Sequence, residues 1–190
     1  MSVEEIFATI SAHMIKGLMI HTQLADYYDF LGLRGYKRCH EYHALKESCS
    51  YRGVNRYYIN HYNKLVPEQR IEDPKIIPDS WYQYTRQDVD SNTKRNAVKN
   101  GLDKWVDWES ETKELYEQMY QELMEQNEVA GALKVKELIE DVDCELKKAQ
   151  RYQLNKKAVD YNISDIIHEQ TRKHEKYKKK LEKEIGVRIC

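Results

Sequence analysis

Four polar residues stand where the helical periodicity of the sequence calls for apolar side chains: His21, Glu47, Glu109 and Glu145. A carboxylate or an imidazole buried in a helical core needs a partner, because desolvating it alone is costly. A metal ion is one partner that satisfies several such groups at once. A hydrogen bond or ion pair within the protein, or simple exposure to solvent, is the alternative for each residue.

The spacing of His43 and Glu47 favours metal binding. Residues four apart project from one face of a helix, so an imidazole and a carboxylate can reach the same ion. Glu145 lies between Val142 and Ala149 in an apolar stripe, which makes it the most anomalous acid of the chain. A solvated His–Glu pair, or chance among 32 acidic residues, explains the same patterns without a metal.

The elements that must position these residues are helices. Seven glycines and three prolines in 190 residues leave few turns. Apolar residues recur every three or four positions in five segments, which we expect to be helices joined by short turns within the first and second pairs. The segments lie around residues 2–28, 36–65, 90–125, 135–152 and 163–185.

All three prolines fall in one stretch, residues 66–88. Proline removes a backbone donor and clashes with the preceding helical turn, so helix cannot persist there. An extended segment of this length spans about 70 Å. We therefore expect a crossover that runs the full length of a bundle.

The positions of the four polar residues match in height. His21 and Glu47 are each thirteen residues from the middle of the first turn, and Glu109 and Glu145 are each eighteen from the middle of the second. Antiparallel pairing puts these residues about 20 Å and about 27 Å from their turns. A crossover that places the two turns at opposite ends brings all four to one layer of a bundle about 47 Å long.

Two hairpins joined by a full-length crossover, with a short fifth helix, resemble the ferritin-like superfamily of ferritins, bacterioferritins and rubrerythrins. The resemblance covers residues 4–160. The stretch Trp108 to Thr112, followed by Glu125 to Glu128, is similar to the family's third helix and the turn after it. The fold implied is an all-α four-helix bundle with a long crossover and an additional C-terminal helix at 163–185, in one domain over residues 1–190.

The resemblance also implies metal ligands. Glu109 matches the bridging glutamate by its distance from the turn, Glu47 falls near the second-helix glutamate, and Asp143 or Glu145 falls near the fourth-helix ligand. Oxygen-rich ligands with one or two imidazoles suit iron or manganese. The expected function is iron oxidation or storage, or removal of oxygen or peroxide, at a divergent di-metal centre of ferroxidase type. The predicted ligands are His21, His43, Glu47, Glu109, Asp143 and Glu145.

The sequence departs from the family pattern in three places. Ser50 stands three residues after Glu47, where the family usually has histidine, and the fourth helix has no histidine in its nearest pattern. The first helix lacks its glutamate, with His13, Gly17 or His21 near the expected place. The alternative function is a non-catalytic helical scaffold with a degenerate or absent metal site.

Composition limits the partners. A formal net charge of −1 argues against nucleic acid. The start of the chain lacks a secretory signal and no apolar run reaches membrane-spanning length, so we expect a cytoplasmic protein without a membrane segment. We also expect a homo-oligomer. Seven basic residues between Arg172 and Lys183 suit a protein partner docking on the last helix, although a solvated helix is the simpler explanation of these charges.

Overall fold

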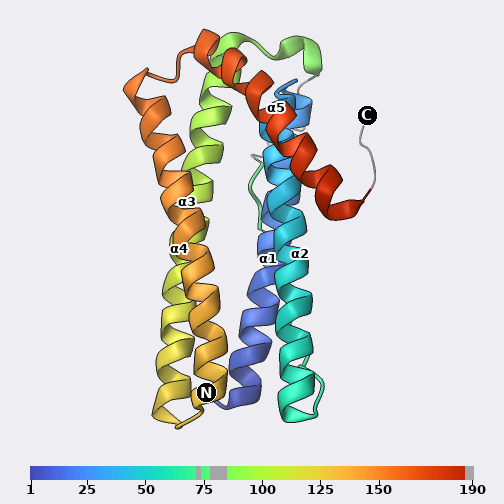
Figure 1. The fold of residues 1–190 in the computed structure, drawn as a ribbon. Coiled ribbons are helices and arrows are strands. Elements are labelled where there is room, and N and C mark those ends of the chain that lie inside the picture. Colours follow the sequence, from blue (N-terminus) through green and yellow to red (C-terminus); the bar gives the residue numbers. More distant parts are fainter. Residues whose placement is uncertain (72–73, 78–84, 187–190) are drawn as a thin grey trace.

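The computed structural model describes residues 1–71, 74–77 and 85–186, and within these residues it contains helices and no strands (Figure 1). This confirms the predicted all-α class. The helices are α1 (Val3–Phe30), α2 (Arg34–Tyr62), α3 (Ser91–Glu125), α4 (Val129–Ala158) and α5 (Ile163–Ile185), with one turn of 3-10 helix at Arg86–Asp88.

The helices form two antiparallel hairpins that lie side by side (Figure 1). The turn between α1 and α2 lies at one end of the bundle, and the turn between α3 and α4 lies at the other. The predicted crossover thus joins α2 to α3 along the length of the bundle. Its described part contacts α1, where the backbone N–H of Ile76 donates to Oε1 of Gln23 at 3.2 Å. Residues 72–73 and 78–84 of this crossover, including Pro78, lie outside the described residues.

Local sequence signals set most helix ends. Ser2 and Glu5 form the predicted capping box at the start of α1, and the Asp90 side chain caps α3 by accepting from the backbone N–H of Thr93. Gly32 adopts a φ of 72°, which lets the chain reverse between α1 and α2. The largest differences from expectation are in α4, which spans Val129–Ala158 and so extends six residues beyond the predicted 135–152 at each end. Helix α2 ends at Tyr62 instead of near residue 65.

The apolar core is divided into two clusters. One lies toward the α1–α2 end and includes Leu24, Tyr28 and Trp105, all of them buried. The other lies toward the α3–α4 end and includes Ile10 and Leu123. The predicted polar layer falls between these clusters, so the helices that close the core also hold the polar residues away from bulk solvent.

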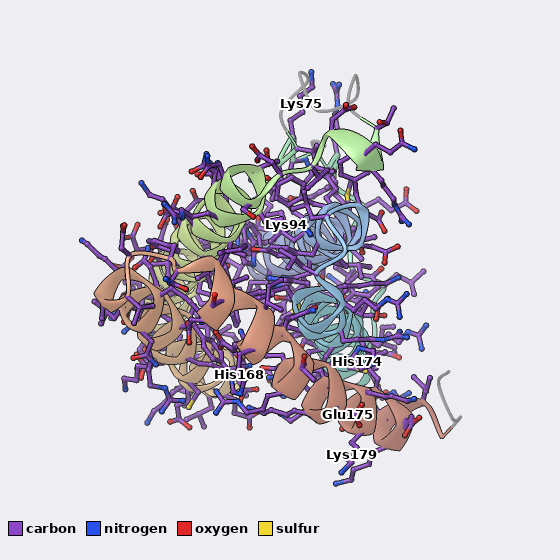
Figure 2. The ribbon with its side chains drawn as sticks, turned by 90° about the horizontal axis from the view of Figure 1, so that it is seen from above. Lys75, Lys94, His168, His174, Glu175 and Lys179 are labelled. Carbon is purple, nitrogen blue, oxygen red and sulfur yellow. The ribbon has the colours of Figure 1, made fainter. Side chains whose placement is uncertain are left out.

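Helix α5 crosses the α1–α2 end of the bundle and packs on α2 (Figures 1 and 2). Ile166, Tyr177 and Leu181 bury its apolar face. One of its basic residues, Lys173, is also buried, so the charge of this helix is only partly available to solvent. A protein partner docking on α5 remains a prediction. No helix in the described part of the chain is long and apolar enough to cross a membrane.

Candidate metal centre

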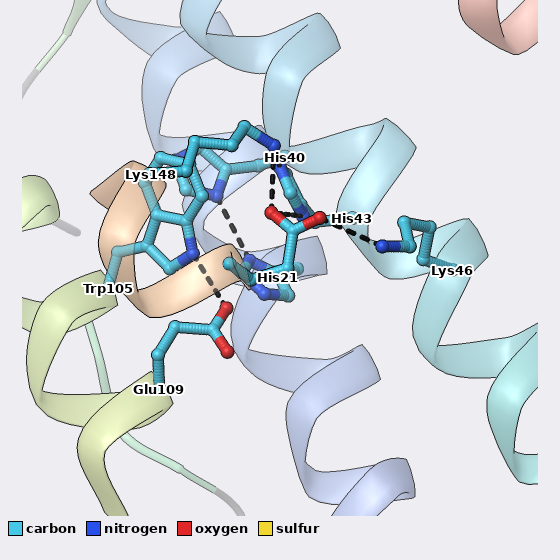
Figure 3. A network of polar contacts seen from close by, with 8 residues as sticks. His21, His40, His43, Lys46, Trp105, Glu109 and Lys148 are labelled. Carbon is cyan, nitrogen blue, oxygen red and sulfur yellow. Dashed lines mark hydrogen bonds and ion pairs between the residues drawn. The ribbon is translucent and has the colours of Figure 1, made fainter. Parts of the chain in front are cut away.

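A small cavity of about 60 Å³ lies in the middle layer of the bundle. Four of the six predicted ligands line it, and they come from α2, α3 and α4: His43, Glu47, Glu109 and Glu145. Its wall also includes Ser50 and Thr112, whose hydroxyl groups can complement charged ligands. Part of this polar network is seen from close by in Figure 3. Acids from both hairpins therefore surround one cavity, in agreement with the common depth predicted from their distances to the turns.

Glu47 and Glu109 are the two most strongly desolvated carboxyl groups of this cavity. Burial, and then the nearby charge of Glu109, raises the pKa of Glu47 to about 8. Burial also raises the pKa of Glu109 to about 7, against the opposing effect of the Trp105 indole N–H, which donates to Glu109 Oε1 at 2.8 Å. Both carboxyls would therefore be stabilised in their charged form by a cation placed between them.

Gly17 of α1 explains how Glu47 fits inside. A methyl group at this glycine would lie 3.0 Å from Cδ of Glu47 and 2.9 Å from the ring of Trp108. The absence of a side chain lets the Glu47 carboxyl pack directly against α1. At this contact the first helix therefore supplies space instead of a fourth acidic ligand.

Glu145 is neutralised by two lysines, which the sequence-based prediction had not included. Lys46 Nζ donates to Oε1 and Lys148 Nζ to Oε2, each at 2.8 Å (Figure 3). Burial alone would raise the pKa of Glu145, but these ammonium groups outweigh it and lower the pKa. Lys148 Nζ also lies 2.9 Å from Nε2 of His43. Glu145 is thus inside the polar layer as predicted, but its partners are cationic side chains.

His21 belongs to a buried histidine cluster beside the cavity. Its Nδ1 lies 3.1 Å from Nδ1 of His40, and its ring centroid lies 5.3 Å from that of His43. Burial lowers the pKa of His21 to about 3, and it also lowers the pKa values of His40 and His43 well below their usual range. All three imidazoles are therefore neutral near pH 7. His40 was not among the predicted ligands, although its spacing of three from His43 places both on one face of α2.

Asp143 lies outside the cavity. It pairs with Lys113 at 2.9 Å and with Lys147, and Asp141 lines the cavity from the same helix. Of the two acids predicted as the fourth-helix ligand, only Glu145 reaches the middle layer.

These side chains do not fit a two-metal centre. Within residues 1–71, 74–77 and 85–186, no three His, Cys, Asp or Glu side chains are arranged to hold one ion. Where α1 contacts Glu47 it presents Gly17, which has no side chain to act as a ligand, and Lys148 binds both Glu145 and His43. Glu47 and Glu109 remain as two carboxylates without a cationic side chain at ion-pair distance in the described residues, and they can serve a single ion.

Solved structures place this arrangement among known folds. The chain superposes with a TM-score of 0.76 on an engineered closed form of the Archaeoglobus fulgidus ferritin, at 11% identity over 92% of this chain and 96% of that chain. This chain has the ferritin-like fold. The open-pore ferritin of the same hyperthermophilic archaeon gives identical values, and a humanized archaeal ferritin gives a TM-score of 0.75 at 11% identity over 90% and 94%. No protein-family model and no curated protein matches the sequence.

The fold predicted by the resemblance is therefore confirmed, including the crossover topology and the added C-terminal helix. At 11% identity the likeness carries the fold alone.

His13 of α1, which stacks on the Trp108 ring, should make the stability of the fold depend on pH. Its ring stacks on Trp108 at 4.1 Å, and its Nε2 lies 2.8 Å from Oγ1 of Thr112. Burial, assisted by the charge of Lys16, lowers its pKa to about 3 from 6.5. A histidine held neutral contributes stability that is present above pH 6.5 and is lost as the pH falls toward 3, because the unfolded chain takes up the proton first.

Between pH 7 and pH 5 the wild type should lose about 2 kcal/mol more than a His13→Asn variant, at 1.36 kcal/mol per pKa unit. Urea unfolding at the two pH values measures this difference. The same substitution at the exposed His168 of α5 is the control. Equal pH dependence in the wild type and the His13 variant would show that His13 is not held neutral.

Proposed function

We propose that this ferritin-like bundle binds one divalent cation, iron or manganese, between Glu47 of α2 and Glu109 of α3. The observation that carries the proposal is that both carboxyls face one small cavity, and no lysine or arginine in the described residues forms an ion pair with either. Hard divalent cations are commonly bound by one or two carboxylates, with water as the remaining ligands. The hydroxyl groups of Ser50 and Thr112 would complete a polar wall around the ion.

Neighbouring groups support this role for the two acids. The Trp105 indole N–H fixes one oxygen of Glu109, which leaves its other oxygen free to turn toward the cavity. Gly17 allows Glu47 to lie deep between α1 and α3. The two carboxyl groups are therefore held in place before an ion arrives, which reduces the ordering cost of binding.

A single ion limits the chemistry that we propose. Paired-iron oxidation needs a second ion near the first, and the donors that could hold it, His43 and Glu145, are engaged by Lys148. We therefore propose cation binding and, with iron, storage or sequestration of one ion per chain. We do not assign a ferroxidase step to this cavity.

A non-catalytic scaffold is the second candidate function. It is favoured by the ion pairs of Glu145 with Lys46 and Lys148, which neutralise this acid without a metal. In that case the bundle would act through its surface, as a homo-oligomer or with a protein partner. Exposed Val129 and Leu133, one turn apart near the start of α4, would suit an apolar contact between copies.

Manganese titration of the metal-free chain tests the proposed site. The wild type should bind one Mn²⁺ per chain. Glu47→Gln and Glu109→Gln should each weaken binding by at least about 100-fold, because loss of a ligand costs no less than loss of a supporting contact. Gln keeps the size of each side chain, so the bundle should remain folded.

Asp143→Asn is the matched control. It removes an acid that the resemblance also predicted as a ligand, but one that pairs with Lys113 outside the cavity. It should leave Mn²⁺ affinity within a factor of about two, because this half-buried acid is already neutralised by its lysine partners. A wild type without stoichiometric Mn²⁺, or Gln variants that bind as the wild type does, would reject the cation site and favour the scaffold.

A further inference from the structure

We propose that the ammonium group of Lys148 takes the place of a second cation in the middle layer and so restricts this bundle to one ion. This inference rests on the proposed single-ion function for its biological meaning, but its geometry is independent of Glu47. It identifies Lys148 as a residue that determines how many ions the polar layer accepts.

The position of Nζ is the first support. It lies 2.8 Å from Oε2 of Glu145 and 2.9 Å from Nε2 of His43, between an acid of α4 and an imidazole of α2. A metal ion bound by the same two atoms would lie about 2.0–2.2 Å from each. An ion and the ammonium group therefore compete for the same space.

Protonation supports the same assignment. An ammonium nitrogen has donors and no lone pair, so His43 must accept from it through an unprotonated Nε2. That lone pair is the one a metal would use.

The Lys148 side chain is also confined. It is 17% exposed, and its ammonium lies 5.5 Å from the ring centroid of Trp105 and 5.7 Å from that of Tyr177. These are cation–π distances, so the aromatic walls from α3 and α5 stabilise the charge where it lies. Tyr177 makes the additional helix part of this arrangement, because α5 covers the side of the layer where Lys148 enters.

A second ammonium group, that of Lys46, occupies the other carboxylate oxygen of Glu145. A divalent ion approaching Glu145 would meet two fixed positive charges and would have to displace both hydrogen bonds. Like charges close together in a partly buried site repel strongly, since the effective dielectric constant there is well below that of water. Lys148 contributes more to this exclusion because it alone also engages His43.

Removing the ammonium group should open the second position. We expect Lys148→Ala to raise the stoichiometry from one to two Mn²⁺ per chain, measured by calorimetric titration and by metal analysis after gel filtration. Lys148→Arg retains the charge and should stay at one. Lys147→Ala is the matched control, since this neighbouring lysine is 72% exposed and pairs with Asp143 outside the cavity.

Circular dichroism confirms that each variant is folded, and Lys148→Gln, which keeps most of the length without the charge, replaces the alanine variant if that one unfolds. A folded uncharged variant that binds no more Mn²⁺ than the wild type overturns the inference. A wild type that binds none, with one ion gained in the uncharged variant, overturns the single-ion function and retains the role of Lys148. If Lys147→Ala binds as many additional Mn²⁺ ions as the Lys148 variant, the inference is also overturned, because the gain would then come from lowering the positive charge of the surface in general.

Discussion

Glu169→Gln is expected to lower the free energy of unfolding by about 3–5 kcal/mol, the range for breaking a buried ion pair from one side. Glu169 is buried between Lys156 of α4 and Lys173 of α5, and it pairs with both. The hydroxyl of Tyr36 in α2 also donates to it at 3.3 Å. One carboxylate therefore links three helices, and its loss leaves the buried ammonium group of Lys173 without a neutralising charge, whereas Lys156 keeps its ion pair with Asp165.

Urea unfolding followed by circular dichroism measures this effect. Glu175→Gln is the control, because this glutamate lies on the exposed side of the same helix (Figure 2). It removes the same charge at a cost of no more than about 0.5 kcal/mol, as is usual for surface substitutions. Similar small losses in both variants would mean that Glu169 does not anchor α5.

The same ion pairs show why the basic character of the last helix was ambiguous in the sequence. Lys173 lies over the ring of Tyr152 at 3.6 Å and over that of Tyr36 at 4.6 Å. A buried lysine of this kind adds to the number of basic residues in the sequence, but a partner protein cannot contact its charge. Of the three apolar residues that the sequence offers as anchors of α5, Ile166 and Leu181 are buried, whereas Ile167 is exposed.

The bundle and its middle layer could be predicted because helical rise is constant. Distances from two turns were enough to place Glu47, Glu109 and Glu145 at one depth, and the cavity confirms that placement. The prolines located the crossover because they exclude helix. These inferences use only local geometry, which a single sequence contains.

Side-chain pairing could not be predicted in the same way. Lys46 and Lys148 have the appearance of solvated residues, and only the packing of α2 against α4 brings both to Glu145. The choice between Asp143 and Glu145 was also open, although two residues are separated by about 200° around a helix and so point to nearly opposite sides. Deciding between them requires the rotation of α4 about its axis, which depends on packing with its neighbours.

A glycine beside a turn, such as Gly35, can serve either of two roles: it can supply a positive φ, or it can allow another element to approach closely. Together with Gly32 it brackets the turn between the first two helices, and a turn glycine is expected to supply a positive φ. Only Gly32 does so, while Gly35 lies within the first turn of α2. Its role is close approach, because α5 crosses α2 at this point.

Gly35→Ala is therefore expected to destabilise the fold by about 3 kcal/mol, at the upper end of the usual range for overpacking. A methyl group there would lie 1.9 Å from the backbone oxygen of Gln170 and 2.7 Å from its Cα. Backbone atoms of a helix cannot move aside as the end of a flexible side chain can, so α5 must shift as a unit. Urea unfolding gives the energy, and amide hydrogen exchange should show lost protection concentrated in α5.

Gly53→Ala, on the same helix, is expected to change the free energy of unfolding in the opposite direction. It lies at an exposed position of α2, and a methyl group there would meet no heavy atom within 4 Å. Alanine should raise the free energy of unfolding by about 0.5–1 kcal/mol, because it lowers the conformational entropy of the unfolded chain and favours helix. Opposite signs at Gly35 and Gly53 would separate helix propensity from the steric contact between α2 and α5. Stabilisation at both positions would mean that α5 does not pack on α2 as described.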